Sequence, residues 1–149
     1  MIRALLVVAA VAVTTGACTS EADRAFDYAA QDARDAAERD RLRVEGAARK
    51  AREKGPEAAL AEAVAGDPKR VFGTRTTADG FELDAVYYGQ GQAGGGWTAE
   101  SRSVRLCVRF IGRVEPKPVV EAADVECAAS LPSVAPDSGT FNRTIRLTD

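Results

Sequence analysis

The sequence predicts an α+β protein, in which an N-terminal helical arm and a short helix precede a four- to five-stranded antiparallel sheet. Residues 21–54 consist mostly of strong helix formers, with no proline and a single glycine. Of the 28 large apolar residues found after residue 17, 24 lie beyond Gly55, so the core is expected there. Residues 98–111 alternate apolar and polar side chains, which is the pattern of a half-buried strand.

The chain begins with a pattern that is typical of an export signal. Arg3 precedes an unbroken apolar run of ten residues, Ala4–Val13. This run is too short to cross a bilayer core, which needs roughly 20 residues, but it suits the apolar region of a signal peptide. Small residues and then a cysteine follow in Thr15–Cys18.

This arrangement resembles the signal of a bacterial prolipoprotein. Gly16 and Ala17 suit the two places before the cysteine, whereas Thr15 departs from the aliphatic residue that is usual three places before it. The resemblance implies that residues 1–17 are removed and that Cys18 becomes a lipid-carrying, palmitoylated N-terminus on the extracytoplasmic face of the cell membrane. There are two alternatives: ordinary secretion with an unmodified cysteine, and a signal segment that is retained as a membrane anchor.

The charge balance of the mature chain argues against one class of partner. Without Arg3, 19 basic residues stand against 22 acidic ones, whereas a nucleic-acid footprint needs a basic surplus. The expected partners are therefore the membrane, through the lipid on Cys18, and an envelope protein, with no nucleic acid.

The cysteine count predicts a disulfide. With Cys18 assigned to lipid, Cys107 and Cys127 remain as an even pair in an exported chain, where oxidising conditions favour a bridge. Two separate buried thiols are the alternative. A bridge that closes a loop of about 20 residues stabilises a fold by ~3 kcal/mol in the chain-entropy model.

Residues 18–55 are predicted to form a lipid-anchored helical arm separate from a domain at 56–149. The arm is acidic at its start and basic at its end, as the helix dipole favours, and Gly46 marks a candidate break. Because large apolar residues are few and Asp40 interrupts the alanine-rich seam, a solvated spacer is favoured over packing on the sheet or self-association. Gly55-Pro56 ends the arm, and 56–65 reads as a short second helix.

Period-two patterns predict the strands of the domain. A turn at 78–80 is expected to join the first two strands. In the third, Cys107 falls on the polar face, so a disulfide there would fasten chain to the outside of the sheet. The predicted strands are 71–77, 81–88, 98–111, 119–127 and 140–148.

Catalytic chemistry has little support in the sequence. There is no histidine, which removes histidine-dependent triads and histidine metal ligands, so no catalytic residue, metal site or cofactor is predicted. The glycine-rich run at 89–96 lacks the Lys-Ser/Thr of a phosphate loop and is expected to be a flexible loop. Glu82 with Asp84, and Asp124 with Glu126, each place two carboxylates on one strand face, which most often is a solvated face.

The candidate contact residues are aromatic. Trp97 closes the glycine-rich run, and Tyr87 and Tyr88 precede it, so an exposed aromatic cluster beside a loop is one hypothesis. The other is that Trp97 and Tyr87 cover the core. A non-catalytic binding or adaptor module is the favoured function; small-ligand binding or sensing is the alternative, and a carboxylate-based hydrolase is a third class.

Overall fold

The computed structural model describes residues 20–132, 134–135, 139–140 and 142–149. The predicted lipid site, Cys18, lies outside these residues and stays a prediction. The helices are α1 (Glu21–Lys50), the one-turn 3-10 helix η1 (Arg52–Lys54), α2 (Pro56–Gly66) and the one-turn 3-10 helix η2 (Gly96–Thr98). The strands are β1 (Val71–Thr76), β2 (Gly80–Ala93), β3 (Glu100–Arg113), β4 (Val119–Asp124), β5 (Val134–Ala135), β6 (Gly139–Thr140) and β7 (Arg143–Ile145).

The predicted α+β class is confirmed. Strands β1 to β4 form an antiparallel sheet in chain order, and β7 pairs with β3 beyond the end of β4. The last strand differs from its prediction because it is only three residues long and runs parallel to β3. Within the described part of the chain, no helix is both long and apolar enough to cross a membrane.

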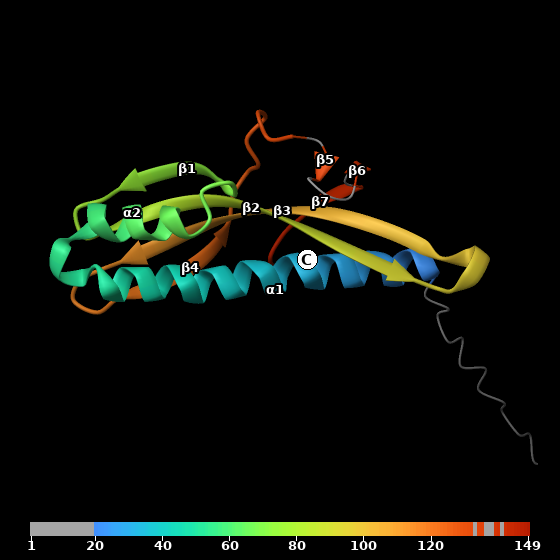
Figure 1. Cartoon of the computed structure of the whole chain (residues 1–149), viewed down its shortest axis with the longest axis horizontal. Coiled ribbons are helices and arrows are strands. Elements are labelled where there is room, and N and C mark those ends of the chain that lie inside the picture. The colour runs from blue at the N-terminus through green and yellow to red at the C-terminus, as the bar shows by residue number, and fades with distance from the viewer. Residues whose placement is uncertain (1–19, 133, 136–138, 141) are drawn as a thin grey trace, which may run out of the picture.

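Helix α1 lies along one face of the sheet for almost the whole length of the β2–β3 hairpin (Figure 1). It begins with a capping box between Ser20 and Asp23 and continues without a break through Gly46. Its buried side chains are Ala25, Ala29, Ala30, Ala33, Ala37, Val44, Ala47 and Ala48, and most of them belong to the same core cluster as the sheet. The expectation of a solvated spacer is therefore wrong, and residue 55 does not separate two cores.

Two glycines of β2 explain why a helix so poor in large side chains packs here. A Cβ atom at Gly89 would lie 2.0 Å from the carbonyl oxygen of Ala29, and one at Gly91 would lie 2.0 Å from that of Ala25. The sheet thus meets the helix backbone to backbone, which only glycine permits. The expected flexible loop at 89–96 is wrong in its first half, because residues 89–93 pair in register with β3.

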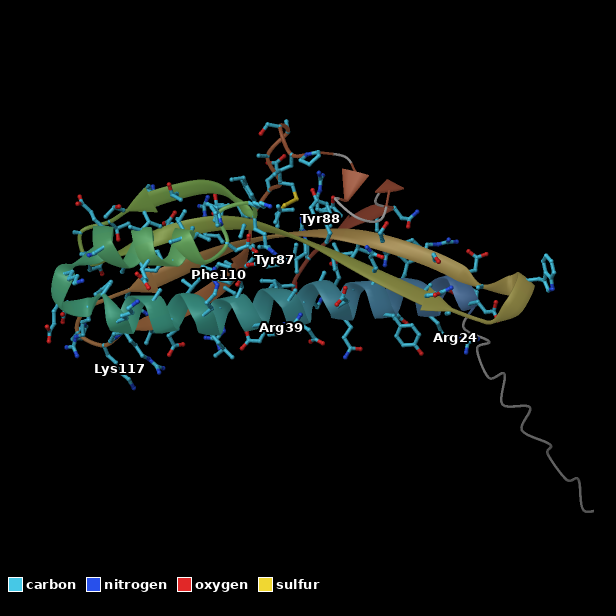
Figure 2. All side chains as sticks on the ribbon, viewed as in Figure 1. Arg24, Arg39, Tyr87, Tyr88, Phe110 and Lys117 are labelled. Atoms are coloured by element: carbon cyan, nitrogen blue, oxygen red, sulfur yellow. A yellow bond between two sulfur atoms is a disulfide. The ribbon has the colours of Figure 1, made fainter. Side chains whose placement is uncertain are left out.

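The opposite half of the hairpin packs large side chains against α1, α2 and β4. Figure 2 labels Tyr87 and Phe110, whose rings meet edge to face with centroids 6.3 Å apart. The Tyr87 hydroxyl donates a 2.7 Å hydrogen bond to Asp40, and Arg43 donates one of 2.8 Å to the same carboxylate. Asp40, which interrupts the alanine seam in the sequence, is therefore a satisfied polar group at the edge of the core.

The disulfide prediction is confirmed. The Sγ atoms of Cys107 and Cys127 lie 2.09 Å apart and their Cα atoms 5.4 Å apart. As predicted, Cys107 lies on the sheet face opposite to the helices, and the bridge, yellow in Figure 2, fastens the chain after β4 over that outer face.

Candidate functional site

The β2–β3 hairpin ends in a tip that carries the chain's single tryptophan. The two strands pair continuously up to Ala93 and Glu100, and residues 94–99 connect them. Gly94 and Gly96 adopt φ values of +84° and +62°, a region that L side chains rarely occupy, so these two glycines define the turn. We use "hairpin tip" for residues 94–99.

Trp97 is fully exposed, with a relative accessibility of 105%. The hypothesis that it covers the core is therefore wrong. Large aromatic side chains usually bury much of their surface, and a fully exposed one marks a candidate contact site. The exposed indole belongs to the segment beyond the last paired residues of β2 and β3, not to the sheet itself.

The structure does not bring the three predicted contact aromatics together. Tyr87 is completely buried under α1, so it belongs to the core. Burial and the hydrogen bond to ionised Asp40 raise the pKa of the Tyr87 phenol well above its usual range. Tyr88 is half-buried on the outer face, where its hydroxyl donates a 3.2 Å hydrogen bond to the carbonyl oxygen of Pro132. Only Trp97 remains an exposed contact residue.

The hairpin tip is uncharged but stands on a charged base. Residues 93–99 contain no acidic or basic side chain, and the first charge after them, Glu100, forms a 2.8 Å ion pair with Arg102. Arg102 and Arg143 both place their guanidinium groups near the ring of Phe26 in α1, at 5.5 and 4.5 Å from its centre. These contacts hold the base of the tip against the start of α1.

The start of α1 adds negative charge beside this base. Glu21 and Asp23 stand in the first helical turn, and hydrogen bonds from the Ser20 side chain and backbone lower the pKa of Asp23. Sequence reasoning missed Phe26, Arg102 and Arg143 as supports of the tip. Their contacts join segments distant in the chain, and no local pattern signals them.

Three of the four carboxylates in the two predicted pairs have structural partners. Arg109 binds Asp84 through two hydrogen bonds of 2.6 and 2.8 Å, and Arg75 binds Glu82 at 2.6 Å. Asp124 accepts a 2.7 Å hydrogen bond from the backbone N–H of Leu147. Glu82 and Asp84 were expected on a solvated face, but their side chains are only 17% and 14% exposed and are held in ion pairs. Asp124 and Glu126 are exposed, as expected.

The described residues line shallow clefts on the outer face. One of about 420 Å³ lies between the ends of β2 and β3 and Asn142, and one of about 610 Å³ lies beside β7. Their volumes suit small molecules, but their linings are mainly polar, unlike the apolar concave pocket that typically binds them. Within the described part of the chain, no cluster of acidic residues and cysteines is arranged to hold a metal ion.

Comparisons with protein-family models, with curated proteins and with solved structures found no match for this chain.

Proposed function

We propose that this protein is an envelope lipoprotein that acts as a non-catalytic binding module and makes its contact through the hairpin tip. One observation carries the proposal: a fully exposed tryptophan at the end of a continuously paired hairpin. The export signal and Cys18 support the anchored location.

The tip has the physical properties of a contact site. The indole offers a large apolar surface with few rotatable bonds, so burying it against a partner costs little conformational entropy. The supporting strands pair in register for 14 residues each, and the base is fixed to α1 through Phe26. The tip is therefore presented on a rigid element.

A photo-crosslinking side chain at position 97 tests the contact in intact host cells. The matched control carries the same side chain at Lys117, which is exposed in the turn at the opposite end of the hairpin (Figure 2). We expect adducts with protein or lipid at position 97 that exceed those at position 117. Equal labelling at the two positions contradicts the proposed contact.

A stability measurement keeps this test separate from folding. Because Trp97 makes no core contact, we expect Trp97→Ala to change the free energy of unfolding by less than about 0.5 kcal/mol. A larger loss contradicts the assignment of Trp97 to binding alone.

The anchor has its own test. Mass spectrometry of the protein from its host should find an N-terminal peptide that begins at Cys18 and carries acyl chains. Cys18→Ser should leave the chain unprocessed or release it from membranes. An unacylated N-terminal peptide beginning at Cys18 contradicts the lipoprotein assignment.

A further inference from the structure

We infer that the partner of the hairpin tip is the membrane itself: Trp97 enters the headgroup region of the bilayer beside the lipid on Cys18. This inference rests on the proposed lipid anchor and deepens the proposed function, because it names the partner of the same site. The tip would then be a second membrane contact that fixes how the molecule stands on the surface.

The first step of the argument is that the tip and the start of α1 share one end of the molecule. Gly91 lies against Ala25, and only four helical residues, or ~6 Å, separate Ala25 from Glu21. Two further strand residues, or ~7 Å, bring β2 from Gly91 to Ala93. The strands therefore end about level with the first residue of α1, and the tip projects beyond it (Figure 1).

The second step is the length of the tether. Cys18 is two residues before Ser20, the N-cap of α1, and two extended residues span at most ~7 Å. A lipid on Cys18 would therefore hold the start of α1 within about that distance of the membrane surface. Since the tip projects past the start of α1, it is the part of the described hairpin that meets the headgroups first.

The third step is chemical. Tryptophan favours the membrane–water interface, where its ring meets apolar surface and its N–H stays hydrated. The absence of charged side chains from residues 93–99 means that no charge is desolvated as the tip enters. The backbone polar groups of the turn stay satisfied because an interfacial residue reaches only about 5–10 Å, where water is present.

The surrounding charge indicates which lipid surface fits. The start of α1 carries Glu21, Asp23 and Asp27 beside the exposed Arg24 (Figure 2). Arg102 beside the tip is paired with Glu100, and Arg143 lies over the ring of Phe26, so the acidic side chains at this end outnumber the basic ones. No basic excess is available there to attract anionic headgroups. We therefore assign the contact to the neutral interface, driven by the indole, and expect little dependence on salt.

The test uses the fluorescence of Trp97, the sole tryptophan. Lipidated protein from its host is reconstituted in phosphatidylcholine vesicles, with or without brominated chains, and compared in solution with the Cys18→Ser chain that is released from membranes. We expect emission at shorter wavelength and strong quenching by brominated lipid, both retained in high salt. Emission unchanged by reconstitution, or a shift that salt abolishes, overturns the inference.

A matched control places the reporter at the other end of the hairpin. A variant with Trp97→Phe and Lys117→Trp, which puts the single indole in the β3–β4 turn, should show neither the shift nor the quenching. Equal quenching of both reporters means that the molecule lies flat on the bilayer, and this overturns the proposed orientation.

The failure of this inference is distinguishable from the failure of the proposed function. If Trp97 stays in water on vesicles while position 97 crosslinks to a protein in cells, the membrane contact is wrong and the binding module stands. If position 97 gives no adduct above position 117 and no fluorescence change, both are wrong. An unacylated Cys18 removes the premise and overturns the membrane contact.

Discussion

Helix α1 covers the two halves of the β2–β3 hairpin in two different ways. We use "core half" for residues 80–87 of β2 with residues 106–113 of β3, and "tip half" for residues 88–93 with residues 100–105. In the core half, α1 and α2 cover Phe81, Leu83 and Tyr87 of β2 together with their partners in β3. In the tip half, the covered positions of β2 are Gly89 and Gly91, and the helix meets them with alanines. The first half is held by side-chain volume, the second by the closeness of two backbones.

The difference teaches that complete burial does not measure apolar stabilisation. Ala29 and Phe110 are both fully inaccessible. Burying a methyl group is worth less than burying an aromatic ring, because the gain follows the apolar area removed from water. The tip half therefore depends on dispersion contacts and on polar contacts such as the 3.1 Å hydrogen bond from the Gln90 N–H to Asp32.

Removing volume from the core half should have the largest effect. Phe110→Ala deletes a fully buried ring that packs edge to face on Tyr87, and we expect it to lower the free energy of unfolding by about 3–5 kcal/mol. Urea denaturation measures the loss. Ile111→Ala, on the exposed face of the same strand, is the control and should cost much less; similar losses would mean that the core half does not depend on volume.

The second prediction concerns the disulfide, which is attached to β3 where the core half and the tip half meet. Cys107 pairs with Val86 in the centre of the hairpin, and its bridge to Cys127 closes a loop with a sequence separation of 20. We expect the double variant Cys107→Ala/Cys127→Ala to lose ~3 kcal/mol, chiefly because the unfolded chain regains freedom. The reduced wild-type protein should match it in denaturation. A loss confined to the reduced protein contradicts this account.

Even the smallest side chain added to the tip half should lower the free energy of unfolding. Gly91→Ala places a Cβ atom 2.0 Å from the Ala25 carbonyl oxygen, and we expect a loss of about 1–3 kcal/mol as the start of α1 is displaced. Hydrogen exchange should accelerate in residues 21–33 more than in the core half.

Gly95→Ala is the matched control for this variant. Its Cβ atom meets nothing within 4 Å, and its backbone is extended, with φ −153°. We expect a change below about 0.5 kcal/mol. Equal losses at positions 91 and 95 would show that close packing is not the cause.

The smallest expected effect concerns the polar group of the core half. Partial burial opposes ionisation of Asp40, but hydrogen bonds from Arg43 and Tyr87 outweigh it and lower its pKa. A lowered pKa gives stability that is present above the unfolded value of about 4 and is lost as pH falls through the folded value. Asp40→Asn should therefore cost about 1–2 kcal/mol at pH 7, and this difference should shrink below about pH 4.

Denaturation at several pH values measures this dependence. Glu38→Gln serves as the control, because Glu38 is an exposed partner of Arg41 and should change stability by less than about 0.5 kcal/mol. A gap between wild type and Asp40→Asn that stays constant down to pH 2 contradicts the role of the ionised carboxylate.

The strands of the core half were predictable because large apolar residues alternate in them. Leu83 and Tyr87, and Leu106 and Phe110, lie on the buried face as the period predicts. In the tip half, the strand 98–111 was predicted, but residues 89–93 of β2 and the packing of α1 on them were missed. Glycine has low strand propensity and alanine adds little hydrophobicity, so each of these two segments alone resembles a loop or a solvated helix. The two segments taken together did carry a signal for close packing. Glycines stand two residues apart at 89 and 91, and alanines recur every four residues in 25–37.

One other miss and one undecided alternative also depend on long-range contacts. Asp40 indicated an interrupted seam, but its partner Tyr87 is 47 positions away. The exposure of Trp97 was one of two hypotheses, and the sequence could not decide between them because the outcome depends on the extension of the paired strands to Ala93, past the predicted end at residue 88. Local patterns predict which face a residue occupies, not how far a hairpin continues.

The alanine–glycine contact also has a consequence for conformational entropy. Alanine and glycine have no side-chain rotamers to lose, whereas ordering a leucine or isoleucine side chain costs about 0.5–1 kcal/mol. The helix thus fastens the tip half of the hairpin without freezing any side chain on Gly89, Gly91 or their alanine neighbours. What must be ordered there is almost entirely backbone, so larger residues in this contact would add both crowding and rotamer loss.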